Sequence, residues 1–382
     1  MLTIIQKEDA VYNYFPDNYW STIRVAGIIN ESYLGGGSYG EIIRVVEKLN
    51  TKDPSSWARE WEAIGDKVRG LAQSSEAEGI YSLARDRYLR ATNYYQLGAL
   101  SVAHHGPKMM ELYNKSIECF HRGVKGVRHI EPVKVPYENS HLPGYFLNAS
   151  RQGEKKPVVV IIDGLHGTAE KNFFMMGRAC PEYGLSALCL DGPGTGGSLL
   201  LNGLHSRYDS EVQAKAIFDF LEARTDVDTQ RVALVSPSLG GYYAARAVAF
   251  EKRYTACVCY GAIFDYAEIW ADRPDDHEFW PTLMWILGVN SRAAAREKIS
   301  HFTLRDVAKF IECPTFILHG ENDIQVPLSH AYRTYDALRC QKKLRIFSKE
   351  DGGDTHCQQD DLLVMREEVL AWLTSTFSLK SS

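Results

Sequence analysis

The sequence lacks the features of a membrane or secreted protein. No uninterrupted apolar stretch approaches the roughly 20 residues of a membrane-spanning helix. The first residues, Met1 to Asp9, have no basic start and reach charged side chains too soon for the apolar core of a secretory signal. We therefore expect a cytoplasmic protein that has no membrane partner.

Cysteine pairs and basic runs are missing as well. The eight cysteines are scattered, and none forms the Cys-x-x-Cys spacing of a zinc or redox site, so we expect reduced and mostly buried thiols. A net charge of −5 and the lack of a basic stripe argue against a nucleic-acid partner. What is present is an ordinary globular composition over 382 residues, which is enough for two domains.

The pattern of apolar residues changes near residue 125. Before it the spacing is helical, and after it short apolar runs alternate with helical segments. We expect an N-terminal helical domain over 1–125 and a catalytic α/β domain over 126–382, with a mostly parallel eight-stranded sheet covered by helices on both faces. Helices are expected at 40–49, from a capped start at 53–57 through 71, at 77–100 and at 107–124. Strands are expected at 130–137, 142–147, 158–162, 186–190, 232–235, 256–260, 315–318 and 344–347.

One segment is longer than a crossover between strands requires. Between Tyr260 and Pro314 lie about fifty residues rich in tryptophan and phenylalanine, and long insertions of this kind are often lids. We expect a helical lid insertion over about residues 263–312. Its aromatic side chains either bind a flat apolar substrate or form the insertion's own core.

The stretch from Ser236 to Gly241 carries the most chemical information. It follows an apolar strand and precedes a helical pattern that begins at Tyr242. A serine at the apex of a sharp strand-to-helix turn is the layout of a nucleophile elbow, although Ser236 replaces the usual glycine two residues before the apex. The strained apex requires small residues two positions away on either side, and Ser236 and Gly240 meet that requirement. Ser238 is therefore the predicted nucleophile.

Two later strand ends supply an acid and a histidine in the order that such enzymes use. Asp323 follows the strand at 315–318, and His356 follows the last strand. A histidine can accept the serine proton and return it to a leaving group, while an aspartate fixes the histidine tautomer. The sequence thus predicts Ser238, His356 and Asp323 as a catalytic triad.

The loop after the strand at 158–162 is glycine-rich and predicts an oxyanion hole. Its two donors would be the backbone amides of Leu165 and of Leu239, the residue after the nucleophile. The predicted chemistry requires neither a metal ion nor an organic cofactor. Other side chains near the same strand ends rank lower for the triad roles, namely the histidines His166 and His319 and the acids Asp351 and Asp354.

Three stretches carry a resemblance to a known family: 85–95 (RDRYLRATNYY), 191–198 (DGPGTGGS) and the elbow through Tyr243. With them the chain resembles the α/β-hydrolase superfamily, in the subgroup with an N-terminal helical domain. That subgroup includes the fermentation–respiration switch proteins, dihydroxypseudooxynicotine hydrolase and fungal polyketide-shortening hydrolases. The resemblance implies an α/β-hydrolase fold, a helical domain that covers the active site, and a homodimer.

The resemblance also implies an auxiliary acid. In members that hydrolyse carbon–carbon bonds, an acidic residue follows the strand after the elbow helix, and the matching residue is Glu268. Its carboxyl group could hold a substrate enol or phenol, or pass a proton to a carbanion leaving group. The alternatives are a glutamate on a helix surface or one in a salt bridge that holds the insertion, for instance to Arg273.

These features predict a serine hydrolase that acts on a small-molecule carbonyl compound. It would cleave a carbon–carbon or ester bond next to the carbonyl through an acyl-enzyme. The resemblance points to a polyketide-like or acyl-aromatic substrate. Two alternatives stay open: a non-hydrolytic cyclase or lyase that uses the same pocket, and a binding or regulatory protein built on the hydrolase fold.

Overall fold

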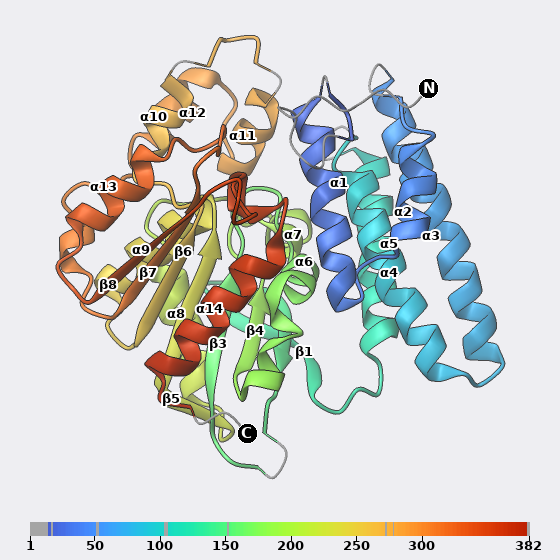
Figure 1. Cartoon of the computed structure of the whole chain (residues 1–382), viewed down its shortest axis with the longest axis horizontal. Coiled ribbons are helices and arrows are strands. Elements are labelled where there is room, and N and C mark those ends of the chain that lie inside the picture. Colours follow the sequence, from blue (N-terminus) through green and yellow to red (C-terminus); the bar gives the residue numbers. More distant parts are fainter. Residues whose placement is uncertain are drawn as a thin grey trace. The chain divides into compact units, whose positions relative to one another are not determined.

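The computed structural model describes residues 14–16, 18–50, 53–102, 106–150, 153–271, 273–277 and 279–379. Met1 to Asp9, which bear on a secretory signal, lie outside this part. The chain forms two compact units, which can be followed along the colour bar of Figure 1. The first comprises Met1–Ala103, Pro107–Gly123 and Gln359–Asp361, and the second comprises His104–Gly106, Val124–Gln358 and Leu362–Ser382.

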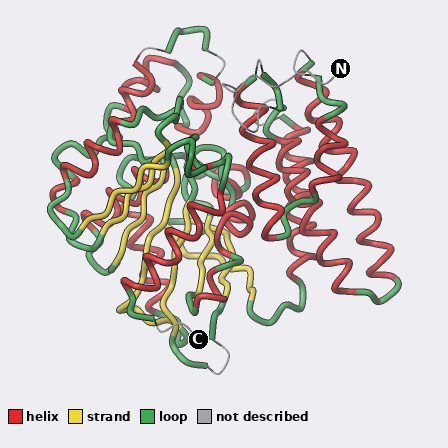
Figure 2. Tube along the Cα trace, in the orientation of Figure 1, coloured by secondary structure: helices red, strands yellow, loops and turns green. Residues whose placement is uncertain are grey.

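The first unit is helical, as Figure 2 shows. Helix α3 starts with a side-chain cap, because the Asp53 carboxylate accepts a hydrogen bond from the Ser55 amide at 3.0 Å. Helices α3 and α4 pack side by side, and the buried Trp57 Nε1 donates to Leu97 O at 2.7 Å. The helices are α1 (Tyr19–Glu31), η1 (Ser32–Leu34), α2 (Tyr39–Val46), α3 (Pro54–Ala77), α4 (Tyr81–Ala99) and α5 (Pro107–Val124).

Several helix boundaries of this unit differ from the sequence prediction, and α3 runs to Ala77 instead of residue 71. Helix α1 was not predicted, because its isoleucine, valine and threonine residues favour strands and obscure the helical spacing. Helix α4 begins at Tyr81 instead of residue 77. Gly79 adopts φ 76°, a left-handed conformation that ends the preceding helix and separates it from α4.

The second unit contains an eight-stranded sheet with the order β1-β2-β4-β3-β5-β6-β7-β8. The pairs β1–β2 and β2–β4 are antiparallel, and all other pairs are parallel. This confirms the predicted leading hairpin and the mostly parallel sheet. The strands are β1 (Ile130–Tyr137), β2 (Ser140–Leu147), β3 (Lys156–Ile162), β4 (Ser186–Leu190), β5 (Val227–Pro237), β6 (Ala256–Tyr260), β7 (Thr315–Gly320) and β8 (Lys342–Phe347).

Helices cover the sheet on both faces. Helices α8 and α9 pack together against β5, and α13 packs on β7 and β8. Helix α14 packs on β6 with the turns η2 and η3, and it crosses in front of the strands in Figure 1. The covering elements are α6 (Ala169–Asn172), η2 (Phe173–Gly177), η3 (Cys180–Tyr183), α7 (Gly196–Leu200), α8 (Glu211–Glu222), α9 (Leu239–Phe250), α13 (Ser329–Ala337), η5 (His356–Gln358) and α14 (Leu362–Thr376).

The long segment between β6 and β7 contains α10 (Tyr266–Ala271), α11 (Trp280–Leu287), α12 (Arg292–Ile299) and η4 (Ala308–Phe310). Trp270 and Trp280 are both buried, with ring centroids 4.8 Å apart. The Arg296 guanidinium lies over the Trp280 ring, 4.6 Å from its centroid. These aromatic side chains therefore form the insertion's own core. Among the described residues no helix is both long and apolar enough to cross a bilayer.

Gly144 in β2 provides a test of the sheet packing. A Cβ atom there would lie 2.2 Å from the backbone oxygen of Cys189 in β4, where nothing flexible can yield. We expect Gly144→Ala to lower the free energy of unfolding by about 1–3 kcal/mol. Gly70→Ala in α3 is the control: no atom lies within 4 Å, and removing a helical glycine should raise stability by up to about 1 kcal/mol. Urea denaturation measures both, and a Gly144→Ala midpoint equal to wild type would contradict the close approach.

Candidate active site

The chain turns sharply at Ser238, between β5 and α9. Ser238 has φ 54° and ψ −126°, a conformation that side-chain-bearing residues avoid. Its amide donates to Tyr260 O at 2.8 Å, and its carbonyl accepts from the Gly241 amide at 2.9 Å. Helix α9 starts at Leu239, three residues before the predicted start, because two glycines of low helix propensity conceal its first turn.

The packing around this turn explains its unusual sequence. A Cβ atom at Gly240 would lie 3.0 Å from Ile162 O and 3.1 Å from the Cβ atom of Ser236. A side chain at position 240 would therefore force these neighbours to shift by a few tenths of an ångström, whereas position 236 accommodates a small side chain. Ser236 is fully buried, and its hydroxyl has no hydrogen-bond partner within the described part of the chain.

Three predicted residues lie in one hydrogen-bonded chain. His356 Nε2 is 2.9 Å from Ser238 Oγ, and His356 Nδ1 is 2.7 Å from Asp323 Oδ2. The other carboxylate oxygen, Asp323 Oδ1, accepts from the amides of Gln325 and Val326 at 2.8 and 2.9 Å. Since the carboxylate only accepts, Nδ1 carries the hydrogen and Nε2 is free to receive the serine proton.

Burial and charge act in opposite directions on this pair. Burial alone would lower the pKa of His356, but the adjacent Asp323 carboxylate outweighs it and raises that pKa well above the ordinary value. Burial would likewise raise the pKa of Asp323, yet attraction and hydrogen bonding to His356 hold it below the ordinary value. The arrangement therefore favours an ionised acid beside a basic imidazole.

The loop after β3 lies against the start of α9. A Cβ atom at Gly164 would lie 2.9 Å from the Leu239 amide nitrogen, so only glycine permits this approach. The Gly164 amide donates to Asp163 Oδ1 at 2.7 Å, while the half-buried Leu165 donates its amide to no acceptor in the described residues. As the first residue of α9, Leu239 also has an amide without an intrahelical acceptor. Neither amide therefore has a hydrogen-bond acceptor within the described residues.

The lower-ranked candidates have other surroundings. The His166 ring lies 6.5 Å from the Phe279 ring, measured between centroids. Asp351 accepts from the Ser348 amide, and Asp354 accepts from Asn322. None of these three side chains is part of the hydrogen-bonded chain through His356. His319 contacts the Asp323 loop instead.

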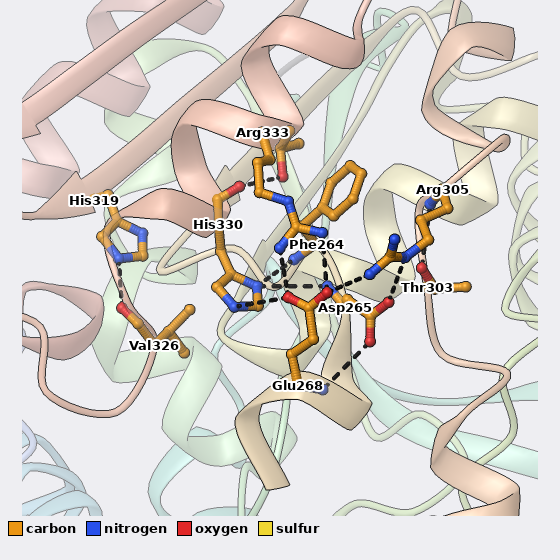
Figure 3. A network of polar contacts seen from close by, with 10 residues as sticks. Phe264, Asp265, Glu268, Thr303, Arg305, His319, Val326, His330 and Arg333 are labelled. Atoms are coloured by element: carbon orange, nitrogen blue, oxygen red, sulfur yellow. Dashed lines mark hydrogen bonds and ion pairs between the residues drawn. The ribbon is translucent and has the colours of Figure 1, made fainter. Parts of the chain in front are cut away.

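Glu268 lies in a network of charged side chains, shown in Figure 3. Arg333 donates to both of its carboxylate oxygens, one at 3.1 Å, and Arg305 donates to Oε1. Arg305 also binds the buried Asp265 at 3.0 Å. Arg273, the example offered for a salt-bridge partner, instead places its guanidinium 4.2 Å from the Trp270 ring centroid. Arg305 and Arg333 are 37 and 65 residues from Glu268 along the chain, too distant for sequence spacing to suggest.

The hydrogen bonds from Arg333, which outweigh burial, hold the pKa of the Glu268 carboxyl below its usual range. A carboxyl group in this state is an ion-pair partner and a poor proton donor near neutral pH. His330 completes the network, since its Nδ1 accepts from the Phe264 amide at 3.2 Å and its Nε2 lies 3.9 Å from Glu268. These contacts favour the salt-bridge alternative for Glu268.

Comparison with known proteins agrees with the fold. Residues 208–379 match the model of the prolyl oligopeptidase family. The chain is 30% identical to the α/β-hydrolase xenA of Xenoacremonium sinensis over 67% of its own length, but it spans only 62% of that protein. It is 24% identical to the hydrolase acrC of Aspergillus aculeatus over 97% of this chain and 99% of that one.

A solved structure shares the whole architecture. The crystal structure of 2,6-dihydroxy-pseudo-oxynicotine hydrolase superposes with a TM-score of 0.79, covering 93% of this chain and 97% of that one at 22% identity. A likeness at this identity establishes the fold. Together with the family match and the fungal relatives, it shows that the chain belongs to the α/β-hydrolase superfamily.

Proposed function

We propose that this protein is a serine hydrolase that cleaves a carbon–carbon or ester bond next to a carbonyl group. The observation that carries this proposal is the continuous hydrogen-bonded chain from Ser238 through His356 to Asp323. The chain begins at an elbow whose φ of 54° is retained only under strong local packing. The relatives' names, which are those of hydrolases, also support it.

The proposed reaction has two halves. Ser238 Oγ attacks the carbonyl carbon while its proton passes to His356 Nε2, and the oxyanion accepts hydrogen bonds from the Leu165 and Leu239 amides. The bond beside the carbonyl then breaks, and His356 returns the proton to the leaving carbon or oxygen. A water molecule, deprotonated by His356, attacks the acyl-enzyme and releases a carboxylic acid together with free Ser238.

The substrate class rests on resemblance. An acyl-aromatic or polyketide-like compound is the proposed substrate, because a hydrolase with the same architecture is named for 2,6-dihydroxy-pseudo-oxynicotine. The aromatic residues of the insertion add little support, since Trp270 and Trp280 pack on one another. We assign Glu268 to holding the insertion through Arg333. The homodimer and the cytoplasmic location stay predictions.

The covalent mechanism is tested at the elbow, where two serines, Ser236 and Ser238, lie two positions apart in the sequence. We expect Ser238→Ala to lower kcat by about 10⁴- to 10⁶-fold, because the nucleophile and its base act as one unit. Ser236→Ala is the matched control, since the Ser236 hydroxyl has no partner in the described residues and the side chain stays small; it should retain near wild-type turnover. The readout is hydrolysis of a nitrophenyl ester, and appreciable turnover by Ser238→Ala would refute the mechanism.

The pH dependence follows from the raised pKa of His356. Only the neutral ring accepts the serine proton, so kcat/KM should rise with pH, with a midpoint above the ordinary histidine value of about 6.5. In Asp323→Asn the imidazolium loses its stabilising charge. The midpoint should therefore move to lower pH while kcat falls by about 10⁴-fold. A pH–rate profile of both proteins checks this, and an unchanged midpoint in the variant would contradict the assigned pair.

Hydrolysis is separated from cyclase or lyase chemistry by the fate of water oxygen. The proposed mechanism transfers one oxygen atom from water to the released acid. We expect products formed from an acyl-phenol in ¹⁸O-labelled water to carry one label in the new carboxyl group, by mass spectrometry. Unlabelled product from an enzyme that still turns over would favour the non-hydrolytic alternative.

A further inference from the structure

His319 contacts the loop that holds the proposed catalytic acid. It lies in β7, and its side chain is fully buried. Its Nε2 atom is 2.9 Å from Val326 O and 3.6 Å from Asp323 Oδ2. Figure 3 shows the ring and the Val326 carbonyl joined by this contact. The other ring nitrogen, Nδ1, has no hydrogen-bond partner in the described residues.

The contact fixes the protonation state of the ring. Because a carbonyl oxygen only accepts, Nε2 of His319 carries the hydrogen. Burial, which outweighs the nearby Asp323 charge, holds the pKa of His319 below its ordinary value. The ring is therefore neutral near neutral pH. A cationic His319 would compete with His356 for the Asp323 carboxylate, and the neutral ring does not.

Val326 connects this histidine to the acid. Its amide donates to Asp323 Oδ1 at 2.9 Å, while its carbonyl accepts from His319 Nε2 at 2.9 Å. Val326 is only 2% exposed, so water does not replace either bond. With Oδ1 occupied by the loop amides, Oδ2 stays directed at His356 Nδ1, 2.7 Å away.

We propose that His319 is a positioning residue for the reaction: its Nε2–H group, through the Val326 carbonyl, holds the Asp323 carboxylate on His356. This inference rests on the proposed hydrolase function and extends it to a residue outside the triad. It accounts for a buried histidine that takes no part in the chain from Ser238 to Asp323.

Other ionisable groups lie near the proposed triad and His319. Cys357 and Asp163 interact electrostatically with His356 in addition to Asp323. His330 interacts electrostatically with His319. The Asp163 carboxyl is buried, which raises its pKa. None of these groups binds Val326 O, so a variant at His319 changes the hydrogen bond to that carbonyl and leaves the others in place.

Two amide substitutions distinguish the effect of the Nε2 hydrogen-bond donor from the effect of side-chain size. Gln places an amide nitrogen near the Nε2 position, whereas Asn places it near Nδ1, short of Val326. With a nitrophenyl ester as probe, we expect His319→Asn to lower kcat by about 10- to 100-fold, with KM changed by less than about twofold. The acidic limb of the pH–rate profile of this variant should move to lower pH, because a displaced Asp323 carboxylate stabilises the His356 imidazolium less. His319→Gln should keep kcat within about threefold of wild type and keep the limb in place.

A stability control comes from Tyr254→Phe. This change removes a buried hydrogen bond to Ala214 O, 2.9 Å long, at the opposite end of the parallel strands. It should lower the melting temperature without moving kcat or the pH limb. A loss of kcat in Tyr254→Phe equal to that of His319→Asn would overturn the proposal, because it would reduce the effect to general destabilisation.

Two further results would overturn the proposal. One is a His319→Asn variant whose kcat and pH–rate profile match those of wild type. The other is an equal loss of kcat in the Asn and Gln variants. If His319→Asn does not fold, His319→Leu replaces it. Leucine also lacks a hydrogen-bond donor, so kcat and the pH–rate profile of His319→Leu are compared with those of His319→Gln in the same way. Ser238→Ala distinguishes failure of the proposed hydrolase function from failure of the proposed role of His319. Turnover by Ser238→Ala refutes the hydrolase function, whereas an inactive Ser238→Ala beside an unaffected His319→Asn refutes only the role of His319.

Discussion

The strained backbone of Ser238 is the constraint on which the active end of the sheet depends. A residue with φ 54° and ψ −126° costs roughly 1–3 kcal/mol, and it persists only where neighbours enforce it. Here the Tyr260 carbonyl holds the Ser238 amide, and Gly164 and Gly240 let adjacent backbone approach within contact distance. The same approach that enforces the turn brings the Leu239 amide beside the loop of Leu165. One packing arrangement thus places Ser238 at the apex of the turn and the Leu239 amide beside the loop after β3.

Two histidines of the site lie next to the same buried carboxylate, that of Asp323. Both His319 and His356 lose hydration on burial, which lowers a histidine pKa, but only His356 ends with a raised one. The difference follows from geometry. His356 Nδ1 makes a direct 2.7 Å contact with Asp323 Oδ2, whereas His319 Nε2 is 3.6 Å away and directs its hydrogen to Val326. Two histidines next to one acid therefore stay in different protonation states.

Much of the fold could be predicted from the sequence, because strands covered on both faces must be apolar throughout. All eight predicted strands are present, and the order of nucleophile, acid and histidine follows from which strand ends they occupy. Side-chain pairing between distant elements could not be predicted. The sequence offers Arg273, five residues away, as one example of a salt-bridge partner for Glu268, but Glu268 pairs with Arg305 and Arg333, which tertiary packing brings to it. The link between His319 and Val326 is short in sequence, yet nothing in the residue types shows that the ring turns toward that carbonyl.

The order of strands along the chain has a consequence for biosynthesis. Ser238 leaves the ribosome 118 residues before His356, which follows β8, the last strand of the sheet. Until β8 has paired with β7, a nascent chain holds Ser238 without His356 beside it. Because contacts of such sequence separation form late in folding, the proposed mechanism implies that the Ser238 hydroxyl stays inert through synthesis and early folding. In the proposed mechanism, reactivity and completion of the sheet therefore coincide, so Ser238 becomes reactive only once the protein has folded.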